Sequence, residues 1–224
     1  MPLTDSSRAE FAALFDWDGV VMDSAGAHER SWEALAAEEK FTLPADHFLR
    51  GFGKRNVSIF PDLGWATDEK EISRLSLRKE EHYRLILGDT PLEPLPGVRE
   101  LLGQLKAAGI PCAVGTSTER RNIEVCTRLL GLDGHFQAII SSEDVTNGKP
   151  DPEVFLKGAA AFGVPPERCV VFEDSLAGIE AGLAGGMKVV AVATTNPIEK
   201  LHRATWAVER LTAVNLDSLR NLFV

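Results

Sequence analysis

Residues 11–21 read FAALFDWDGVV and join a short apolar run to two acidic residues. The apolar run predicts a buried strand that ends at Asp16. Because Asp16 and Asp18 are two positions apart, side-chain alternation lets both carboxylates lean to the same side. Gly19 permits a sharp turn directly after them. The segment therefore predicts a strand that delivers two carboxylates to the edge of a sheet.

Four more apolar runs follow, with helical patterns between the later ones. The runs are residues 111–115, 136–140, 169–172 and 188–192, and the helical patterns lie at about 97–108, 119–130, 152–162 and 175–184. Continuous apolar runs that alternate with helices indicate a parallel sheet covered on both faces. Each run ends in a polar or small residue, and open α/β sheets bind ligands beyond the carboxyl ends of their strands. The pattern predicts a Rossmann-like α/β core with its polar residues gathered at one edge.

The interval 24–92 breaks this alternation, because it contains helical patterns but no convincing strand. One helix would place His28, Trp32 and Leu35 on a single face. Another would run over residues 67–87 with Thr67 as its N-cap. The interval is therefore predicted to be an all-helical insertion.

The proline-rich segment 91–97, PLEPLPG, closes the insertion and is where a hinge could sit. We accordingly expect two domains. Residues 1–23 and 93–224 would form the α/β catalytic core, and residues 24–92 would form a helical cap domain.

Composition narrows the class of protein. The net charge of −9 argues against binding to nucleic acid or to an anionic membrane, since both are negatively charged. No run approaches the roughly 20 apolar residues of a membrane span, and the first residues lack a signal-peptide pattern. The three cysteines, Cys112, Cys126 and Cys169, are widely spaced and predict buried free thiols in a reducing compartment. We expect a cytoplasmic protein, monomeric by default, that binds a small molecule.

The acidic residues suit phosphoryl transfer. A carboxylate such as that of Asp16 can attack a phosphoryl group, and a second one, on Asp18, can hold the proton that the leaving oxygen needs. Two such close acids repel each other unless a cation lies between them. Glu173 and Asp174, which end the run 169–172, offer the oxygen ligands that Mg²⁺ prefers. The chain lacks a histidine–cysteine cluster, which makes zinc an unlikely metal.

A phosphate group also needs positive and hydrogen-bonding partners. Lys149, in the proline-braced segment NGKPDP, supplies a point charge. Thr116 and Ser117, in VGTST, supply hydroxyls at a strand-to-helix junction where free backbone N–H groups can bind an anion. These three residues are the expected phosphate-binding set, and they would neutralise charge on the transferring group.

Four segments occur in this order along the chain: the one with Asp16 and Asp18, the one with Thr116, the one with Lys149, and the one with Glu173 and Asp174. Together they resemble the motifs of the haloacid dehalogenase superfamily, in the branch with a helical cap after the first motif. The resemblance covers essentially the whole chain. It implies that Asp16 becomes phosphorylated and that Asp18 shuttles the proton. It also implies that Mg²⁺ is held by Asp16, by the backbone carbonyl of Asp18 and by the pair Glu173 and Asp174, although Glu173 could instead orient the site while Asp174 binds the metal. The acid at position 18 disfavours dehalogenase and phosphonatase chemistry.

Four residues of the insertion are candidates for substrate binding. The segment 78–83, RKEEHY, resembles the cap of beta-phosphoglucomutase-like enzymes, in which a lysine four residues before a tyrosine meets the substrate; Lys79 could equally extend past its neighbours into solvent. His28 matches a mutase histidine near the acid/base residue, but many phosphatases carry one too. Lys54 and Arg55 could bind the distal part of the substrate or form a solvated pair.

Three functions remain open at this point. The first is a Mg²⁺-dependent phosphatase for a small phosphorylated metabolite, such as a sugar phosphate, acting through an aspartyl phosphate. The second is a sugar phosphomutase of the beta-phosphoglucomutase type, although Lys54 and Arg55 follow Gly53 where a single arginine is expected. The third is a non-catalytic metabolite-binding protein, which the presence of every motif residue disfavours.

Overall fold

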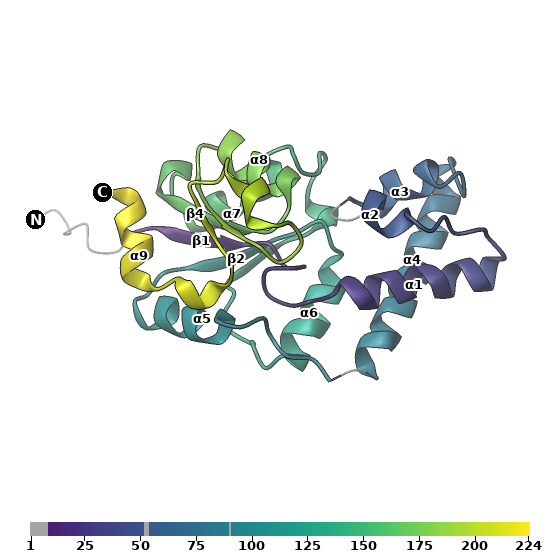
Figure 1. Ribbon diagram of the computed structural model, residues 1–224, viewed down its shortest axis with the longest axis horizontal. Helices are drawn as coiled ribbons and strands as arrows, with labels where there is room; N and C mark the ends of the chain where they lie inside the picture. The colour runs from purple at the N-terminus through teal and green to yellow at the C-terminus, as the bar shows by residue number, and fades with distance from the viewer. Residues whose placement is uncertain (1–8, 52–53, 90) are drawn as a thin grey trace, which may run out of the picture.

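The computed structural model describes residues 9–51, 54–89 and 91–224. Its centre is a parallel sheet with the strand order β3-β2-β1-β4-β5-β6 (Figure 1). The strands are β1 (Ala12–Phe15), β2 (Cys112–Gly115), β3 (Ala138–Ile140), β4 (Cys169–Glu173), β5 (Lys188–Val192) and β6 (Trp206–Val208). The first strand along the chain therefore lies in the middle of the sheet, and the acidic segment that follows it is surrounded by its neighbours.

Helices cover both faces of the sheet. They are α5 (Val98–Ala107), α6 (Arg120–Leu129), α7 (Glu153–Phe162), α8 (Leu176–Ala184) and α9 (Leu216–Arg220), with short 3₁₀ turns η1 (Ser142–Asp144), η2 (Pro166–Arg168), η3 (Ile198–Leu201), η4 (Leu211–Ala213) and η5 (Asn221–Phe223). Side chains of β1 alternate between two clusters. Phe15 packs with residues of α5, α6 and α9, and Leu14 packs with residues of α7 and α8. The predicted α/β Rossmann-like fold is confirmed.

Strand β6 is the strand that sequence analysis missed. It has three residues, only the last of which, Val208, is buried. Its apolar run is only three residues long, shorter than the runs of four to eight residues that indicate a strand. The other five strands lie within the predicted runs or extend them by one residue.

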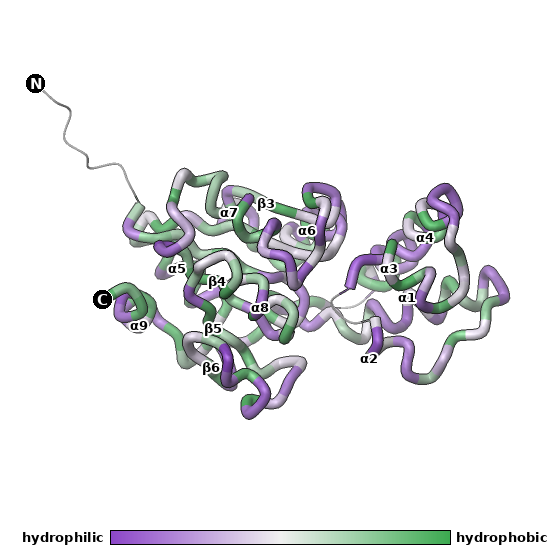
Figure 2. Tube along the Cα trace, turned by 90° about the horizontal axis from the view of Figure 1, so that it is seen from above, coloured by the Kyte–Doolittle hydropathy of each residue, from purple (hydrophilic) through white to green (hydrophobic). Residues whose placement is uncertain are grey.

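The helical insertion lies between β1 and α5, at one end of the molecule (Figures 1 and 2). Its helices are α1 (Ala25–Glu39), α2 (His47–Gly51), α3 (Asn56–Asp62) and α4 (Glu69–Gly88), and no strand occurs among the described residues of this interval. Trp32, Leu35, Phe60 and Leu75 belong to its own apolar cluster. Tyr83, near the end of α4, instead joins the main core. The exact domain boundaries stay a prediction.

The start of α4 corrects one detail. Asp68, and not Thr67, is the N-cap: its carboxylate accepts hydrogen bonds from the backbone N–H groups of Lys70 and Glu71. An ionised acceptor at the N-terminus also interacts favourably with the helix dipole, which explains why the aspartate takes this position.

The turn after β1 is tight and depends on glycine. The backbone carbonyl of Trp17 accepts hydrogen bonds from the N–H groups of Val21 and Met22, at 2.9 and 3.3 Å. Gly19 has a φ of +78°, and a Cβ there would lie 1.9 Å from Oδ2 of Asp174. The absence of a side chain at Gly19 therefore lets the turn lie directly against the acidic end of β4.

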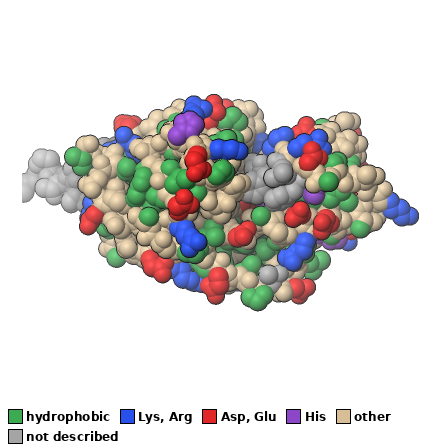
Figure 3. Space-filling model, in the orientation of Figure 1, with side chains coloured by type: hydrophobic (Ala, Val, Ile, Leu, Met, Phe, Trp, Pro, Cys, Tyr) green, Lys and Arg blue, Asp and Glu red, His purple; other side chains and the backbone are tan. Residues whose placement is uncertain are grey.

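Surface and thiol features agree with the expectations from composition. On the face shown in Figure 3, acidic and basic side chains are interspersed over both parts of the molecule. The three cysteines are buried and free, and burial raises the pKa of Cys112 to about 12. None of the helices in the described ranges is both long enough and apolar enough to cross a membrane.

Two glycines near α5 make opposite predictions for stability. Gly97 has a φ of +94°, and a Cβ there would lie 2.4 Å from the backbone nitrogen of Thr212. We expect Gly97→Ala to lower the free energy of unfolding by about 2–4 kcal/mol, because it adds backbone strain and a clash. Gly103 is inside α5 and a Cβ there would meet nothing within 4 Å. Gly103→Ala should raise the free energy of unfolding by about 0.5–1 kcal/mol.

Urea denaturation of both variants beside the wild type measures these changes. Equal stability of the two variants would contradict the close approach of α5 to the backbone at Thr212.

Candidate active site

Three buried carboxylates meet at the carboxyl ends of β1 and β4. Asp16 follows β1, Glu173 ends β4, and Asp174 follows it. The two strands are neighbours in the sheet, and the backbone N–H of Asp16 donates to the carbonyl of Phe172 at 2.9 Å. One oxygen from each carboxylate lies within 4.8 Å of the others. Strand pairing thus brings together residues that are more than 150 positions apart in the chain.

Lys149 is the cation of this cluster. Its Nζ lies 2.9 Å from Oδ1 of Asp16 and 2.6 Å from Oε1 of Glu173. The side chain is only 4% exposed and its Nζ lies over the ring of Phe155. Burial alone would lower the pKa of Lys149, but the two carboxylates outweigh it and hold the pKa above its ordinary value. The lysine therefore remains charged in the interior.

The two acids at the end of β4 differ in their bonding. Both oxygens of Glu173 are occupied: Oε1 accepts from Lys149, and Oε2 accepts from the backbone N–H groups of Asp174 and Ser175. Asp174 accepts a hydrogen bond from the hydroxyl of Thr195 with Oδ2, whereas its Oδ1 is buried without a hydrogen-bond partner. Asp174 is thus the acid with an unused oxygen, whereas both oxygens of Glu173 already have partners within the protein.

The acidic cluster fits a hard divalent cation. Burial raises the pKa of Asp16 well above its ordinary value despite the opposing effect of Lys149. Burial and the neighbouring Glu173 raise the pKa of Asp174 to about 8. Such shifts mean that the ionised carboxylates lack compensating charge, which a cation beside the unpartnered Oδ1 of Asp174 would supply. The all-oxygen donor set matches the preference of Mg²⁺.

The side chain of Asp18 lies apart from this cluster. Its carboxylate accepts hydrogen bonds from the hydroxyls of Ser24, at 2.5 Å, and Thr118, at 2.6 Å. Nε2 of His28 lies 3.4 Å from Oδ1. Burial alone would raise the pKa of Asp18, but the contacts with His28 and the two hydroxyls outweigh it and lower the pKa. Asp18 is thus an ionised carboxylate that joins β1, the turn after β2 and the start of the insertion.

Thr116 and Ser117 follow β2 and line a cavity that also contains Asp16 and Asp18. The backbone N–H of Thr116 donates to the carbonyl of Ile140, which fixes the turn to the neighbouring strand. The hydroxyl oxygen of Thr116 accepts from the backbone N–H of Thr118 at 3.1 Å. The two predicted phosphate-binding hydroxyls therefore lie on the side of the cavity nearest to Asp18.

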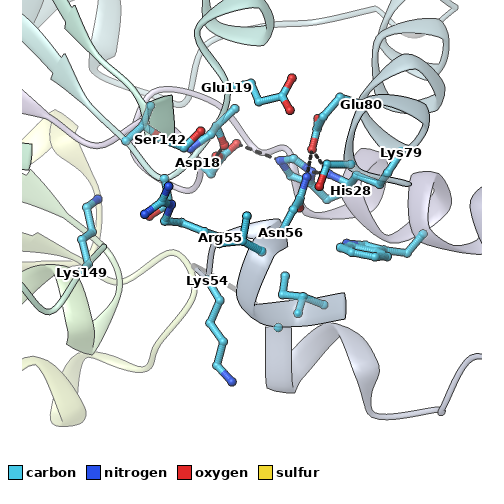
Figure 4. Close-up of a pocket in the computed structure, with 18 of the residues that line it drawn as sticks. Asp18, His28, Lys54, Arg55, Asn56, Lys79, Glu80, Glu119, Ser142 and Lys149 are labelled. Carbon is cyan, nitrogen blue, oxygen red and sulfur yellow. Dashed lines mark hydrogen bonds and ion pairs between the residues drawn. The ribbon is translucent and has the colours of Figure 1, made fainter. Parts of the chain in front are cut away.

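His28 and Lys79 contact each other in the insertion (Figure 4). Nδ1 of His28 lies 2.8 Å from Nζ of Lys79, and its ring stacks on that of Tyr83 with centroids 4.1 Å apart. Lys79 is 2% exposed, so the alternative of a side chain that extends into solvent is wrong. The side chains of Asp18, His28 and Lys79 form a continuous row across the cavity wall.

Glu80 continues this row and was missed in the sequence. Its Oε1 accepts from Lys79 and from Asn56 of α3, at 2.9 and 2.8 Å. Its Oε2 accepts from Asn122 of α6 at 2.5 Å. Glu80 therefore links the insertion to the core. The available sequence signal was weak: an acid beside a lysine on a helix is usually solvated.

The structure separates Lys54 from Arg55. Lys54 is half exposed, pairs with Asp62 at 2.9 Å and points away from Lys149 (Figure 4). Arg55 reaches the core: its Nη1 donates to the carbonyl of Thr146 at 3.0 Å, and its Nε is buried without a hydrogen-bond partner. Of the two, Arg55 is the better placed to meet a ligand in the cavity.

A cavity of about 350 Å³ connects these residues. Its inner end contains Asp16, Asp18, Thr116, Ser117, Lys149 and Asp174. Its outer part contains the apolar residues Trp32, Val57, Ile59 and Leu77 and the polar residues His28, Lys54, Arg55, Asn56, Lys79, Glu80, Glu119 and Glu143. Every predicted site residue except the fully enclosed Glu173 thus lines one space. Thr118, Ser24 and Thr195 also contact the site acids; only Thr118, beside Thr116 and Ser117, could have been anticipated.

Comparisons with known proteins agree with this geometry. A model of the haloacid dehalogenase-like hydrolases matches residues 12–186, more than half of the chain. The chloroplastic 5-amino-6-(5-phospho-D-ribitylamino)uracil phosphatase of Arabidopsis thaliana is 35% identical over 94% of this chain, which spans 57% of that protein. The beta-phosphoglucomutase of Bacillus subtilis is 33% identical over 84% of this chain and 85% of its own length.

A solved structure shows the same fold. The family IA hydrolase of Entamoeba histolytica superimposes with a TM-score of 0.86, covers 95% of this chain and 99% of its own, and is 24% identical. This agreement shows the fold, and the family model and the two relatives above show the family. The chain belongs to the haloacid dehalogenase-like hydrolases, as its four motifs predict.

Proposed function

We propose that this protein is a Mg²⁺-dependent phosphatase that hydrolyses a small phosphorylated metabolite, of the sugar or polyol phosphate class. The observation that carries the proposal is the position of Asp16: its carboxylate lies at the inner end of an enclosed cavity, beside Lys149 and the unpartnered oxygen of Asp174. The names of the two relatives support the substrate class, since one acts on a phosphorylated ribityl group and the other on a phosphorylated glucose.

The chemistry follows from the placement of the two aspartates. The carboxylate of Asp16 attacks phosphorus, the bond to the ester oxygen breaks, and Asp18 in its protonated form delivers its proton to the departing oxygen. This proton is the one that Asp18 takes up from water at the end of the preceding turnover. Asp18 then accepts a proton from a water molecule that attacks the aspartyl phosphate and releases inorganic phosphate. The contacts from Ser24 and Thr118 hold the ionised form of Asp18, which is the form that this second step needs.

Neighbouring residues bind and screen the phosphoryl group. Lys149, Thr116 and Ser117 supply a charge and hydroxyls at the inner end of the cavity. Mg²⁺ would be held by Asp16, Asp174 and the backbone carbonyl of Asp18, with Glu173 as the orienting acid, and would withdraw charge from the transferring group. Lys79, His28 and Arg55 line the outer part, where the rest of the substrate would lie. A cytoplasmic location and a monomeric state complete the proposal.

Asp16→Asn tests the nucleophile. An amide cannot form the acyl phosphate, so we expect kcat for phosphate release to fall roughly a thousand-fold or more on any ester that the wild type hydrolyses. The matched control is Asp23→Asn, the same chemical change at an exposed residue seven positions away. A screen of phosphate esters with inorganic phosphate as the readout measures both. Turnover that survives in Asp16→Asn would disprove the assignment.

Asp174→Asn tests the cation site without relying on turnover. A ligand that binds only the folded state stabilises it, by about 2.7 kcal/mol at a hundred times its dissociation constant. We therefore expect Mg²⁺ to raise the thermal unfolding temperature of the wild type and to lose this effect in Asp174→Asn. Asp217→Asn, at a side chain that is 89% exposed, should respond like the wild type. Equal Mg²⁺ shifts in all three proteins would place the cation elsewhere.

A phosphomutase is the second candidate, and the row from Asp18 through His28 to Lys79 favours it. Such an enzyme would transfer the phosphoryl group back to a sugar and protect Asp16 from water. A coupled assay for glucose 6-phosphate, formed from beta-glucose 1-phosphate in the presence of a trace of glucose 1,6-bisphosphate, distinguishes the two. Phosphate release without isomerisation would identify the phosphatase.

A further inference from the structure

Three carboxylates lie along the outer part of the cavity, on the side away from Lys149. They belong to Glu80 of α4, Glu119 directly before α6 and Glu143 of η1, and all three line the cavity. Figure 4 shows Glu119 beside Glu80, beyond Asp18 and His28. Glu119 follows the phosphate-binding turn by one residue, so any group attached to a bound phosphate passes close to it.

The two lysines of this region are already paired with carboxylates of the protein. Lys79 donates to Glu80, and Lys54 pairs with Asp62. The guanidinium of Arg55 donates to the backbone carbonyl of Thr146 with Nη1, and its buried Nε has no hydrogen-bond partner. Among the described residues that line the outer part, two lysines and one arginine face three glutamates, beside the histidines His28 and His47.

The local potential at Glu119 is negative. Burial, Glu80 and Glu143 raise the pKa of Glu119 to about 7, although Arg84 and Lys79 oppose them. Arg84 approaches the Glu119 carboxylate only to 3.9 Å and donates instead to Asn122 at 2.8 Å. A second anion placed beside Glu119 would be repelled by Glu119 and its acidic neighbours Glu80 and Glu143, whereas hydroxyl or ammonium groups would find acceptors there.

We propose that Glu119 determines specificity: it restricts the substrate to monophosphates whose leaving group is uncharged or carries an amine, and it excludes a second phosphate or a carboxylate. This inference rests on the proposed function, since it assumes that the phosphate binds at the inner end. It also separates the two candidate functions. A mutase that works through a sugar bisphosphate must hold a phosphate at both ends of its cavity, and the acidic outer part opposes this.

The test compares glucose 6-phosphate with glucose 1,6-bisphosphate, which differ by one phosphate. Their dissociation constants are measured by titration calorimetry in the Asp16→Asn background, with Mg²⁺ and at pH 8, where Glu119 is ionised. Glu119→Gln removes the charge and Glu119→Lys reverses it. Glu124→Lys is the matched control, because Glu124 is exposed on the same helix and does not line the cavity.

We expect the Asp16→Asn protein, which is the parent of the other variants, to bind the bisphosphate more weakly than the monophosphate. Glu119→Gln should strengthen binding of the bisphosphate relative to the monophosphate. Glu119→Lys should change the ratio of the two dissociation constants in the same direction by about ten-fold or more, and Glu124→Lys should leave the ratio unchanged. The inference is overturned if the parent prefers the bisphosphate, if the ratio stays within about two-fold in both Glu119 variants, or if Glu119→Lys fails to bind the bisphosphate. Because binding is measured without turnover, an absence of phosphatase activity in the wild type would count against the proposed function alone.

Discussion

The ion pairs of Lys149 with Asp16 and Glu173 are the interaction on which the inner site depends. Three carboxylates buried at the end of two strands would repel one another strongly, and removing one partner of a buried pair typically costs about 3–5 kcal/mol. The lysine lies between Asp16 and Glu173 at 2.9 and 2.6 Å and leaves Asp174 with one unused oxygen. One cation from the protein thus stabilises part of the cluster and leaves a defined place for a second.

Two glycines make this concentration of charge sterically possible. The turn at Gly19 passes so close to Asp174 that any side chain would overlap its carboxylate, and Gly178 of α8 allows Glu173 the same approach, since a Cβ there would lie 1.8 Å from Oε1. The acids can therefore be enclosed by backbone instead of by bulky side chains. Enclosure lowers the local dielectric constant, which strengthens every charge interaction in the site.

The inner site could be read from the sequence, whereas for the outer part the sequence indicated candidate residues but not their contacts. Asp16, Thr116, Lys149 and Asp174 each follow a strand or a proline-braced turn, and parallel strands deliver their carboxyl ends to one edge by geometry alone. Glu80 and Asn122, in contrast, are 42 positions apart on two helices whose meeting depends on how the insertion packs. Thr67 was the predicted cap of α4, and only the fold shows that Asp68 accepts the hydrogen bonds instead. Lys54 and Arg55 are adjacent in sequence yet point to different partners.

The row from Asp18 through His28 and Lys79 to Glu80 connects the inner site to the outer part of the cavity. Each member contacts the next, and the last one binds Asn122 of the core, so the position of the insertion is coupled to the hydrogen bonds around Asp18. A displacement of α4 would withdraw Lys79 from His28, and with it a contact that orients the histidine beside Asp18. The packing of the insertion against α6 therefore sets the environment of Asp18, the proposed acid and base of the reaction.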